Sequence, residues 1–220
     1  MTNTKILEML MAGEIELLKS AIQEEIRLDE LSKKSGGAKN RVAAMKKFFK
    51  FPATNKATCN YPCENVEVLG EKYNSFMTPY SFALTTEDIP GDMEKFNPDT
   101  MGEYFKISRV ANTYDAISTE KIDISKIFAA AKSQGYKFKK AELDCFKAKY
   151  YFEYKGDYFK IGLLEQAFKI IDDGQTATVY YRTKNGMIHL ETSVGLVGIL
   201  PTNYKDKNEF LDGKIIIPVE

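Results

Sequence analysis

The chain has 220 residues, and its 31 basic residues balance 31 acidic ones, so the formal net charge at pH 7 is zero. This balance excludes a global positive field that would attract the protein to DNA, so any nucleic-acid contact requires a local basic patch. Apolar residues make up 44% of the chain and charged residues 28%, values typical of a globular protein whose core can stand alone.

The sequence predicts a cytoplasmic protein without membrane contact. Charged residues interrupt every apolar run before it reaches the length that spans a membrane. The N-terminal stretch "MTNTKILEMLMAGEIELLKS" carries Glu8 among its apolar residues and lacks the pattern of a secretory cleavage site. Cys59, Cys63 and Cys145 form no regular framework, and their odd number is typical of reduced thiols in a cytosol.

The residues that catalysis and metal binding need are scarce. His189 is the only histidine, which leaves a zinc site short of ligands and gives little support to a Cys–His or Ser–His pair. His189 lies in "MIHLET", a predicted strand, where we expect an ordinary cross-strand role. Neither common type of phosphate-binding glycine loop is present in the sequence. We therefore predict no catalytic residues, no metal, no cofactor and a protein that is not an enzyme.

The N-terminal part is predicted to be helical. Residues 3–33 begin at a cap formed by Asn3 or Thr4 and carry an apolar stripe flanked by acidic residues. Paired glycines make "KKSGGAK" at 33–39 a flexible joint. We interpret 1–38 as a helical extension with a glycine linker, which either serves as a docking or dimerising arm or packs on its own domain.

A basic amphipathic helix is predicted next, in "KNRVAAMKKFFKF" at 39–51. At about 100° per residue, four apolar side chains share one face of this helix: Val42, Met45, Phe48 and Phe49. Four basic side chains share the other face: Lys39, Lys46, Lys47 and Lys50. Arg41 alone points to the apolar side. The lysine face is either a solvated surface or a surface for nucleic-acid phosphates.

Short strands and a second helix are predicted after Pro52. The strands are "NVEVL", "KYNSFMT" and "YSFALT", which are rich in β-branched and aromatic residues. Residues 85–103 contain many acids, prolines and glycines and are predicted to form a surface connection. In "KIDISKIFAAAKSQG", Asp123 caps a helix that ends at Gly135. Its apolar stripe consists of Ile124, Ile127, Phe128 and Ala131.

Two hairpins and a third helix are predicted from Glu142 onward. Hairpin turns are expected at Lys155-Gly156-Asp157 and at Lys184-Asn185-Gly186, each between β-rich segments. The helix is "GLLEQAFKIID", with a buried side formed by Leu163, Leu164, Ala167, Phe168 and Ile171. Its expected wet side is net acidic and consists of Glu165, Gln166, Lys169 and Asp172. Strands follow in "VGLVGIL" and "GKIIIPV", and Pro218 places the last one at an edge or a chain end.

A repeated pattern predicts the fold. Residues 39–85 run as a helix followed by three strands, and residues 162–219 run as a helix followed by several strands. We predict one α+β domain at 39–220, built from two units at about 39–110 and 120–220. Each unit combines a helix with an antiparallel sheet, and the two helices pack side by side over one joined sheet.

The residues of the C-terminal part resemble a domain of the bacterial sliding DNA clamp. The resemblance rests on "YFKIGLLEQAFKII", "TATVYYRTKNGMIHL" and "GKIIIPVE". Leu163 and Leu164 stand where the family's leucine pair opens a short helix, and Pro218 stands where its terminal proline does. "RVAAMKKFF" with "VEVLGEKYNSFMTPYSFAL" looks like the first unit of such a domain. The chain is also similar to short clamp-like proteins of phages and bacterial mobile elements, although 1–38 has no counterpart in the family.

The resemblance implies a DNA-clamp fold and a role in DNA replication. In the clamp family, helices face DNA and carry basic side chains that touch phosphates without reading bases. Carried over to the first helix, this role falls on Lys39, Lys46, Lys47 and Lys50. The acidic side expected for the helix "GLLEQAFKIID" at 162–172 would repel a phosphate backbone.

Two functions remain open at this point. The first is a non-catalytic, clamp-like replication accessory that contacts the DNA backbone, peptides of replication proteins, or both, with a monomer and a homo-oligomer both left open. The second is a protein-interaction module of a phage or mobile element that keeps the clamp fold without binding DNA.

Overall fold

The computed structural model describes three stretches of the chain. These stretches are residues 37–49, 62–95 and 118–219, apart from the single residues Leu69, Cys145, Phe146, Gln175, Thr183 and Lys205. The predicted helices at 3–33, together with Lys50 and Cys59, lie outside the described residues. The chain divides into two compact units, Met1–Asn40 and Arg41–Glu220, and all the described strands belong to the second.

The described part of the chain combines helices with runs of mostly antiparallel strands, which confirms the predicted α+β class. The first described elements are α3 (Ala38–Phe48), β1 (Cys63–Val68), β2 (Glu71–Met77), β3 (Ser81–Thr85), β4 (Ser118–Ile122), α5 (Ile124–Ser133) and the 3-10 helix η3 (Lys140–Leu143). They are followed by β5 (Tyr150–Tyr154), β6 (Asp157–Lys160), α6 (Ile161–Phe168), β7 (Ala177–Tyr181), β8 (Ile188–Glu191), β9 (Gly195–Ile199), α7 (Lys207–Leu211) and β10 (Ile215–Pro218).

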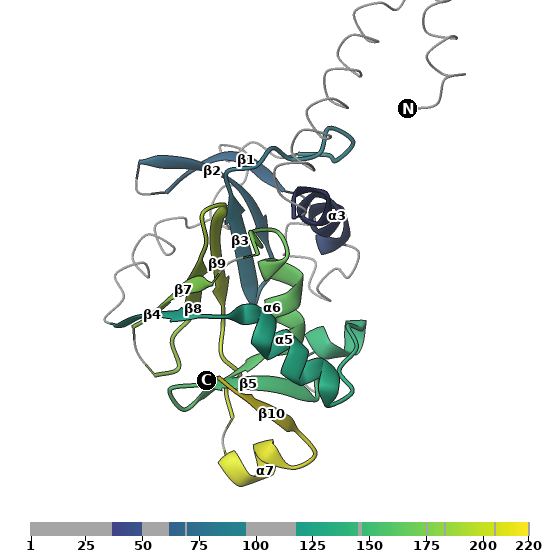
Figure 1. The fold of residues 1–220 in the computed structure, drawn as a ribbon, viewed down its shortest axis with the longest axis vertical. Coiled ribbons are helices and arrows are strands. Elements are labelled where there is room, and N and C mark those ends of the chain that lie inside the picture. Colours follow the sequence, from purple (N-terminus) through teal and green to yellow (C-terminus); the bar gives the residue numbers. More distant parts are fainter. Residues whose placement is uncertain are drawn as a thin grey trace, which may run out of the picture. The chain divides into compact units, whose positions relative to one another are not determined.

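A seven-stranded antiparallel sheet joins two runs of a helix followed by three strands, whereas the last strand of the predicted second unit lies in another sheet. The strand order of the seven-stranded sheet is β1-β2-β3-β9-β8-β7-β4 (Figure 1). Strands β1 to β3 follow α3 and strands β7 to β9 follow α6, so each helix precedes a three-stranded meander. The two meanders meet where β3 pairs antiparallel with β9, with Ser81 opposite Ile199 and Thr85 opposite Gly195. A Cβ atom on Gly195 would lie 2.0 Å from the Leu84 carbonyl oxygen, so this junction requires glycine.

The second sheet departs from the predicted antiparallel pairing. It has three strands in the order β10-β5-β6, and β10 runs parallel to β5. The parallel pairing joins strands that lie far apart in the chain, with Ile215 opposite Tyr150, as parallel neighbours require a long connection. β10 occupies the edge of this sheet, as the proline at position 218 predicts.

Local signals in the sequence place the helix caps and turns. The Asp123 side chain accepts a hydrogen bond from the Ser125 amide at 3.0 Å and caps α5, and Gly135 has a φ of +87° just after that helix. The β5–β6 turn has positive φ at both Lys155 and Gly156. Asn185 is the residue with positive φ in the turn between β7 and β8.

The core lies between the helices and the seven-stranded sheet. The residues predicted to be buried there are indeed buried at Phe48, Leu163, Leu164, Phe168 and Ile171, whereas Phe49 is only partly buried. Met45 and Phe48 from α3 share one apolar cluster with residues of α6 and the sheet. Helix α6 is buried along its whole length, because α5, η3 and the C-terminal end of α3 pack against it in addition to the sheet.

The prediction of a solvent-exposed side on α6 is therefore wrong for two of its four residues. Glu165 and Gln166 are each only 7% exposed, whereas Lys169 is exposed and Asp172 is half-buried. Glu165 accepts hydrogen bonds from the Tyr136 hydroxyl, at 2.7 Å, and from the Lys169 ammonium. The Gln166 side chain donates to the Phe48 carbonyl at 2.7 Å. These partners remove the cost of burying the two polar side chains.

Candidate nucleic-acid interface

Helix α3 has the amphipathic character that the sequence predicts. Met45 and Phe48 are buried, and the lysines at positions 39, 46 and 47 are exposed. Lys50, the fourth predicted phosphate contact, lies outside the described residues. The three described lysines of the predicted interface are therefore solvent-exposed, and the opposite face of α3 packs into the core.

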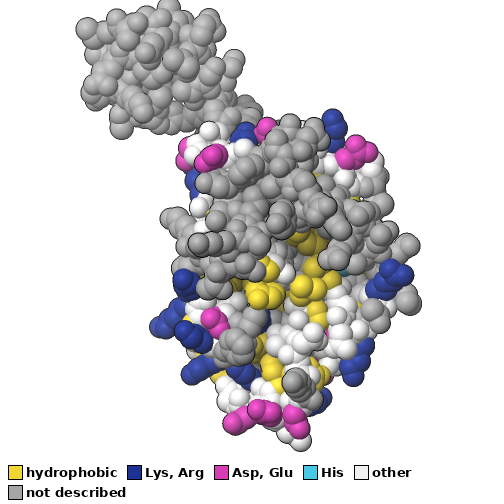
Figure 2. Space-filling model, turned by 180° about the vertical axis from the view of Figure 1, so that it is seen from behind, with side chains coloured by type: hydrophobic (Ala, Val, Ile, Leu, Met, Phe, Trp, Pro, Cys, Tyr) yellow, Lys and Arg dark blue, Asp and Glu magenta, His cyan; other side chains and the backbone are white. Residues whose placement is uncertain are grey.

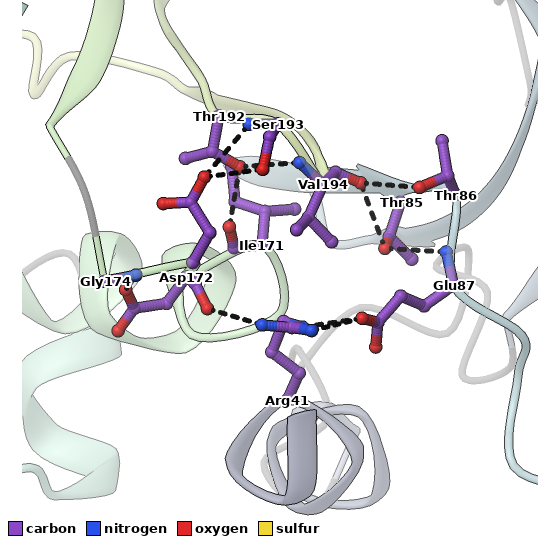
Figure 3. Close-up of polar contacts among 11 residues, drawn as sticks. Arg41, Thr85, Thr86, Glu87, Ile171, Asp172, Gly174, Thr192, Ser193 and Val194 are labelled. Atoms are coloured by element: carbon purple, nitrogen blue, oxygen red, sulfur yellow. Dashed lines mark hydrogen bonds and ion pairs between the residues drawn. The ribbon is translucent and has the colours of Figure 1, made fainter. Parts of the chain in front are cut away.

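Arg41 anchors α3 to the segments that follow β3 and α6, as Figure 3 shows. Its side chain is only 4% exposed, in agreement with its predicted position on the apolar side. The Nε and Nη2 atoms donate to Oε1 of Glu87, which follows β3, with an Nε–Oε1 distance of 2.9 Å. Nη1 donates to the carbonyl oxygen of Asp172, which follows α6, at 2.9 Å. Arginine suits this place because its planar group serves both acceptors at once.

The two segments that Arg41 contacts are themselves tied to the turn between β8 and β9. Thr192 Oγ1 donates to the Ile171 carbonyl at 2.6 Å, and Ser193 donates to the Asp173 carboxylate through both its amide and its hydroxyl (Figure 3). The Thr86 amide donates to the Val194 carbonyl at 3.0 Å. This network fixes the orientation of α3, and hence the direction in which its lysines point, relative to the sheet.

An acidic loop lies beside the exposed lysines. Lys46 forms an ion pair with Asp92 at 2.7 Å, with side-chain exposures of 44% and 64%. The hydrogen bond from Lys46 lowers the pKa of Asp92 below its usual range. Asp92 belongs to the connection after β3, which also carries the acids Glu87, Asp88 and Glu94. Lys47, the next residue along α3, has no ion-pair partner among the described residues, so an acidic side chain balances the charge of Lys46 but not that of Lys47.

A second concentration of lysines was not selected by the sequence analysis. Six exposed lysines fall within 132–149, on the end of α5, on η3 and on the segments around it: Lys132, Lys137, Lys139, Lys140, Lys147 and Lys149. We name this set the α5–η3 lysine surface. The excess of lysine in this window is visible in the sequence, but nothing in the sequence shows that the neighbouring acids point inward.

His189 is placed as a core residue, in agreement with the predicted cross-strand role. It lies in β8 opposite Tyr180 and Gly198, and its ring centroid is 5.8 Å from that of Phe82. Only 1% of the residue is exposed, and this burial lowers its pKa to about 4. The imidazole is therefore neutral at pH 7.

We expect His189 to make the protein less stable as the pH falls from about 6.5 to about 4. A histidine in the unfolded chain has a pKa of about 6.5. Between about pH 6.5 and about pH 4, His189 is therefore protonated in the unfolded state but neutral in the folded state. The stabilisation that comes from keeping this buried ring neutral is fully present above about pH 6.5. The free energy of unfolding then falls by about 3 kcal/mol as the pH is lowered to about 4. Urea unfolding of the parent and of His189→Leu at several pH values measures it. Equal pH slopes in the two proteins would contradict the assignment.

Within the described residues, no group of three or more His, Cys, Asp or Glu side chains is arranged to hold a metal ion. The same part of the chain contains no helix of sufficient length and apolar character to traverse a bilayer. No protein-family model, no curated protein and no solved structure matches the chain.

Proposed function

We propose that the protein is a non-catalytic, clamp-like accessory of DNA replication that contacts the DNA backbone through the exposed lysines of α3. The arrangement of the two helix-and-strand units is the observation that carries this proposal. α3 and α6 each precede a three-stranded meander, and the meanders join through β3 and β9 into one antiparallel sheet. The resemblance to a clamp domain implies this duplicated arrangement, because it concerns a single domain that is built from two such units.

The chemistry of α3 supports phosphate contact. Lys46 and Lys47 are adjacent, exposed and carried by a helix that Arg41, Met45 and Phe48 hold in place. Lysine ammonium groups bind phosphates as point charges and do not distinguish bases, which suits a protein that moves along DNA. The ion pair between Lys46 and Asp92 is exposed, and such pairs contribute only about 0.2–1 kcal/mol, so a phosphate can replace the carboxylate.

Only one of the two helices can take part in this contact. In the clamp family both helices of a domain face the DNA, but here the partners described above bury α6 along its length. The DNA backbone would therefore meet α3 and not α6. Contact on one helix gives weak binding, because affinity rises with the number of phosphates neutralised.

Protein partners are part of the same proposal. Among the described residues, Tyr80, Phe138 and Leu200 are the large hydrophobic side chains that are most exposed. Tyr80 and Leu200 lie together, because the Leu200 amide donates to the Tyr80 carbonyl at 2.9 Å. This pair offers an apolar contact for replication-protein peptides or for a second copy of the chain.

The acidic loop favours a second candidate function. Asp92 already pairs with Lys46, and Asp88 and Glu94 lie in the same connection, so the field beside α3 is less positive than the lysines alone suggest. Under this alternative the protein is an interaction module of a phage or mobile element that keeps the clamp fold without DNA.

We expect the double variant Lys46→Glu/Lys47→Glu to lose most of its affinity for duplex DNA while keeping its fold. Both side chains point away from the core, so the thermal midpoint should not change. If both contact phosphates, the slope of log K against log salt concentration should flatten by about two units, since each contact contributes about 0.9. Fluorescence anisotropy with a labelled mixed-sequence duplex at several salt concentrations measures both quantities.

Lys121→Glu/Lys184→Glu is the matched control, because it changes the net charge by the same amount at two exposed lysines outside α3. The control should keep the affinity and salt slope of the parent. If the α3 double variant and the parent bind the duplex equally at low salt, phosphate contact by α3 is wrong. A parent that binds no nucleic acid at low salt would support the interaction module.

A further inference from the structure

The α5–η3 lysine surface brings together residues from three parts of the chain. Lys132 lies in the last turn of α5, Lys139 and Lys140 lie at the start of η3, and Lys149 directly precedes β5. The Tyr150 hydroxyl donates to the Gln134 carbonyl at 3.0 Å, which places the start of β5 beside the end of α5. In Figure 2, Lys and Arg side chains gather at the lower left, on the side that carries α5.

The fold turns the neighbouring acids away from this surface. Glu142 is 7% exposed and accepts hydrogen bonds from the backbone amides of Lys149 and Tyr150, at 3.1 and 3.3 Å. Asp144 accepts from the Lys147 amide at 3.2 Å. At the other end of α5, Asp123 is used as the helix cap. Each of these carboxylates accepts hydrogen bonds from backbone N–H groups, and none of them forms an ion pair with a lysine of the surface.

Ion pairing separates these six lysines from some of the lysines elsewhere, although Lys47, Lys121 and Lys184 also lack an ion pair among the described residues. Lys46, Lys95, Lys155 and Lys169 each form an ion pair with an acidic side chain. None of the six lysines of the α5–η3 surface has an ion-pair partner within the described part of the chain. A protein with zero formal net charge thus concentrates unbalanced positive charge in one region. Such a concentration is the electrostatic signature of a surface for a polyanion.

We propose that the α5–η3 lysine surface binds the phosphate backbone of a nucleic acid, as a site separate from the lysines of α3. Several ammonium groups on adjacent segments neutralise successive phosphates and release the counterions that those phosphates hold. The surface requires neither the α3 contact nor a clamp-like architecture, because its charge comes from α5, η3 and the segment before β5. It reads no sequence, since lysine contacts to phosphates are independent of the bases.

The variant Lys139→Glu/Lys140→Glu tests this surface. Both side chains are exposed, and glutamate is favourable at the start of a helix, so the fold should remain intact. We expect binding to a mixed-sequence oligonucleotide of about 20 nucleotides, single-stranded or duplex, to weaken roughly tenfold or more at about 0.1 M salt. The salt slope should flatten by about two units for a duplex and by somewhat less for a single strand.

Two matched doubles separate this proposal from the proposed function. Lys46→Glu/Lys47→Glu and Lys121→Glu/Lys184→Glu carry the same change in net charge. A loss confined to the α5–η3 double supports the new surface even if α3 makes no contact. A loss confined to the α3 double overturns the new surface and leaves the proposed function standing. Equal affinity in all three doubles and the parent overturns both.

The same proteins should be tested for sedimentation with vesicles that contain anionic lipid. Lipid headgroups also present phosphates, so a basic surface could serve a membrane instead of a nucleic acid. We expect the parent to bind the oligonucleotides more tightly than the vesicles. Vesicle binding without oligonucleotide binding, lost in the α5–η3 double, would overturn the nucleic-acid assignment in favour of a membrane surface.

Discussion

Replacing Arg41 with Ala is expected to lower the free energy of unfolding by about 3–5 kcal/mol, the usual cost of removing one partner from a buried ion pair. The change leaves the Glu87 carboxylate and the Asp172 carbonyl without their donors, in a place where the arginine itself is 4% exposed. It also disconnects α3 from the segments that follow β3 and α6. Urea unfolding followed by circular dichroism measures the effect.

Two companion variants show whether the loss comes from the contact itself. Arg41→Lys keeps the charge but cannot donate to both acceptors at once, so it should lie between the parent and the alanine variant. Arg41→Met with Glu87→Leu removes both charges and should recover much of the stability lost by Arg41→Ala. If Arg41→Ala unfolds at the same urea concentration as the parent, the anchoring role described for this residue is wrong.

Replacing Phe168 with Ala in the parent protein is also expected to lower the free energy of unfolding by about 3–5 kcal/mol, because the site cannot collapse around the missing ring. Phe168 is 2% exposed at the end of α6, and its ring centroid lies 6.5 Å from that of Phe128 in α5. Its removal creates a cavity between the two helices and the sheet. Equilibrium unfolding in urea gives the change in free energy.

Phe138→Ala is the matched control for the core position. Phe138 is 36% exposed, so the same truncation there should change the free energy of unfolding by less than about 1 kcal/mol. Similar losses in the two variants would mean that Phe168 is not a core residue. A loss confined to Phe168→Ala supports the position assigned to α6.

The sequence predicts those elements that local chemistry determines. Asp123 and Gly135 mark the ends of α5 because capping and positive φ are properties of single residues. The apolar stripe of α3 and the hairpin turns belong to the same class of signal. The repeated order of helix and strands predicts a joined sheet, but that β3 and β9 are the strands that meet in it is a property of the folded chain.

Features that depend on distant partners could not be read from the sequence. Glu165 and Gln166 look like surface residues, and only the contacts from Tyr136 and to Phe48 make their burial favourable. The parallel pairing of β10 with β5 joins residues as distant as Ile215 and Tyr150, so no local pattern in the sequence reveals it. β4 was missed because "STEKI" is short and polar.

The candidate interface divides in the same way. The exposure of Lys46 and Lys47 follows from helical periodicity and is seen in the structure. The pairing of Lys46 with Asp92 joins residues on separate elements, so no local pattern reveals it. The α5–η3 lysine surface depends on where Glu142 and Asp144 direct their carboxylates, which is a property of the folded chain.

The pairing of β3 with β9 also bears on how the protein is made. The two strands lie more than 100 residues apart in the chain, so β3 emerges from the ribosome long before its neighbour exists. At about 5–20 residues per second, synthesis leaves that edge open for roughly 5–20 seconds. All five residues of β3 are buried once the sheet is complete, so an apolar strand with unpaired backbone groups is exposed during this interval. The newly made N-terminal half is thus a natural client for a chaperone that binds extended apolar segments.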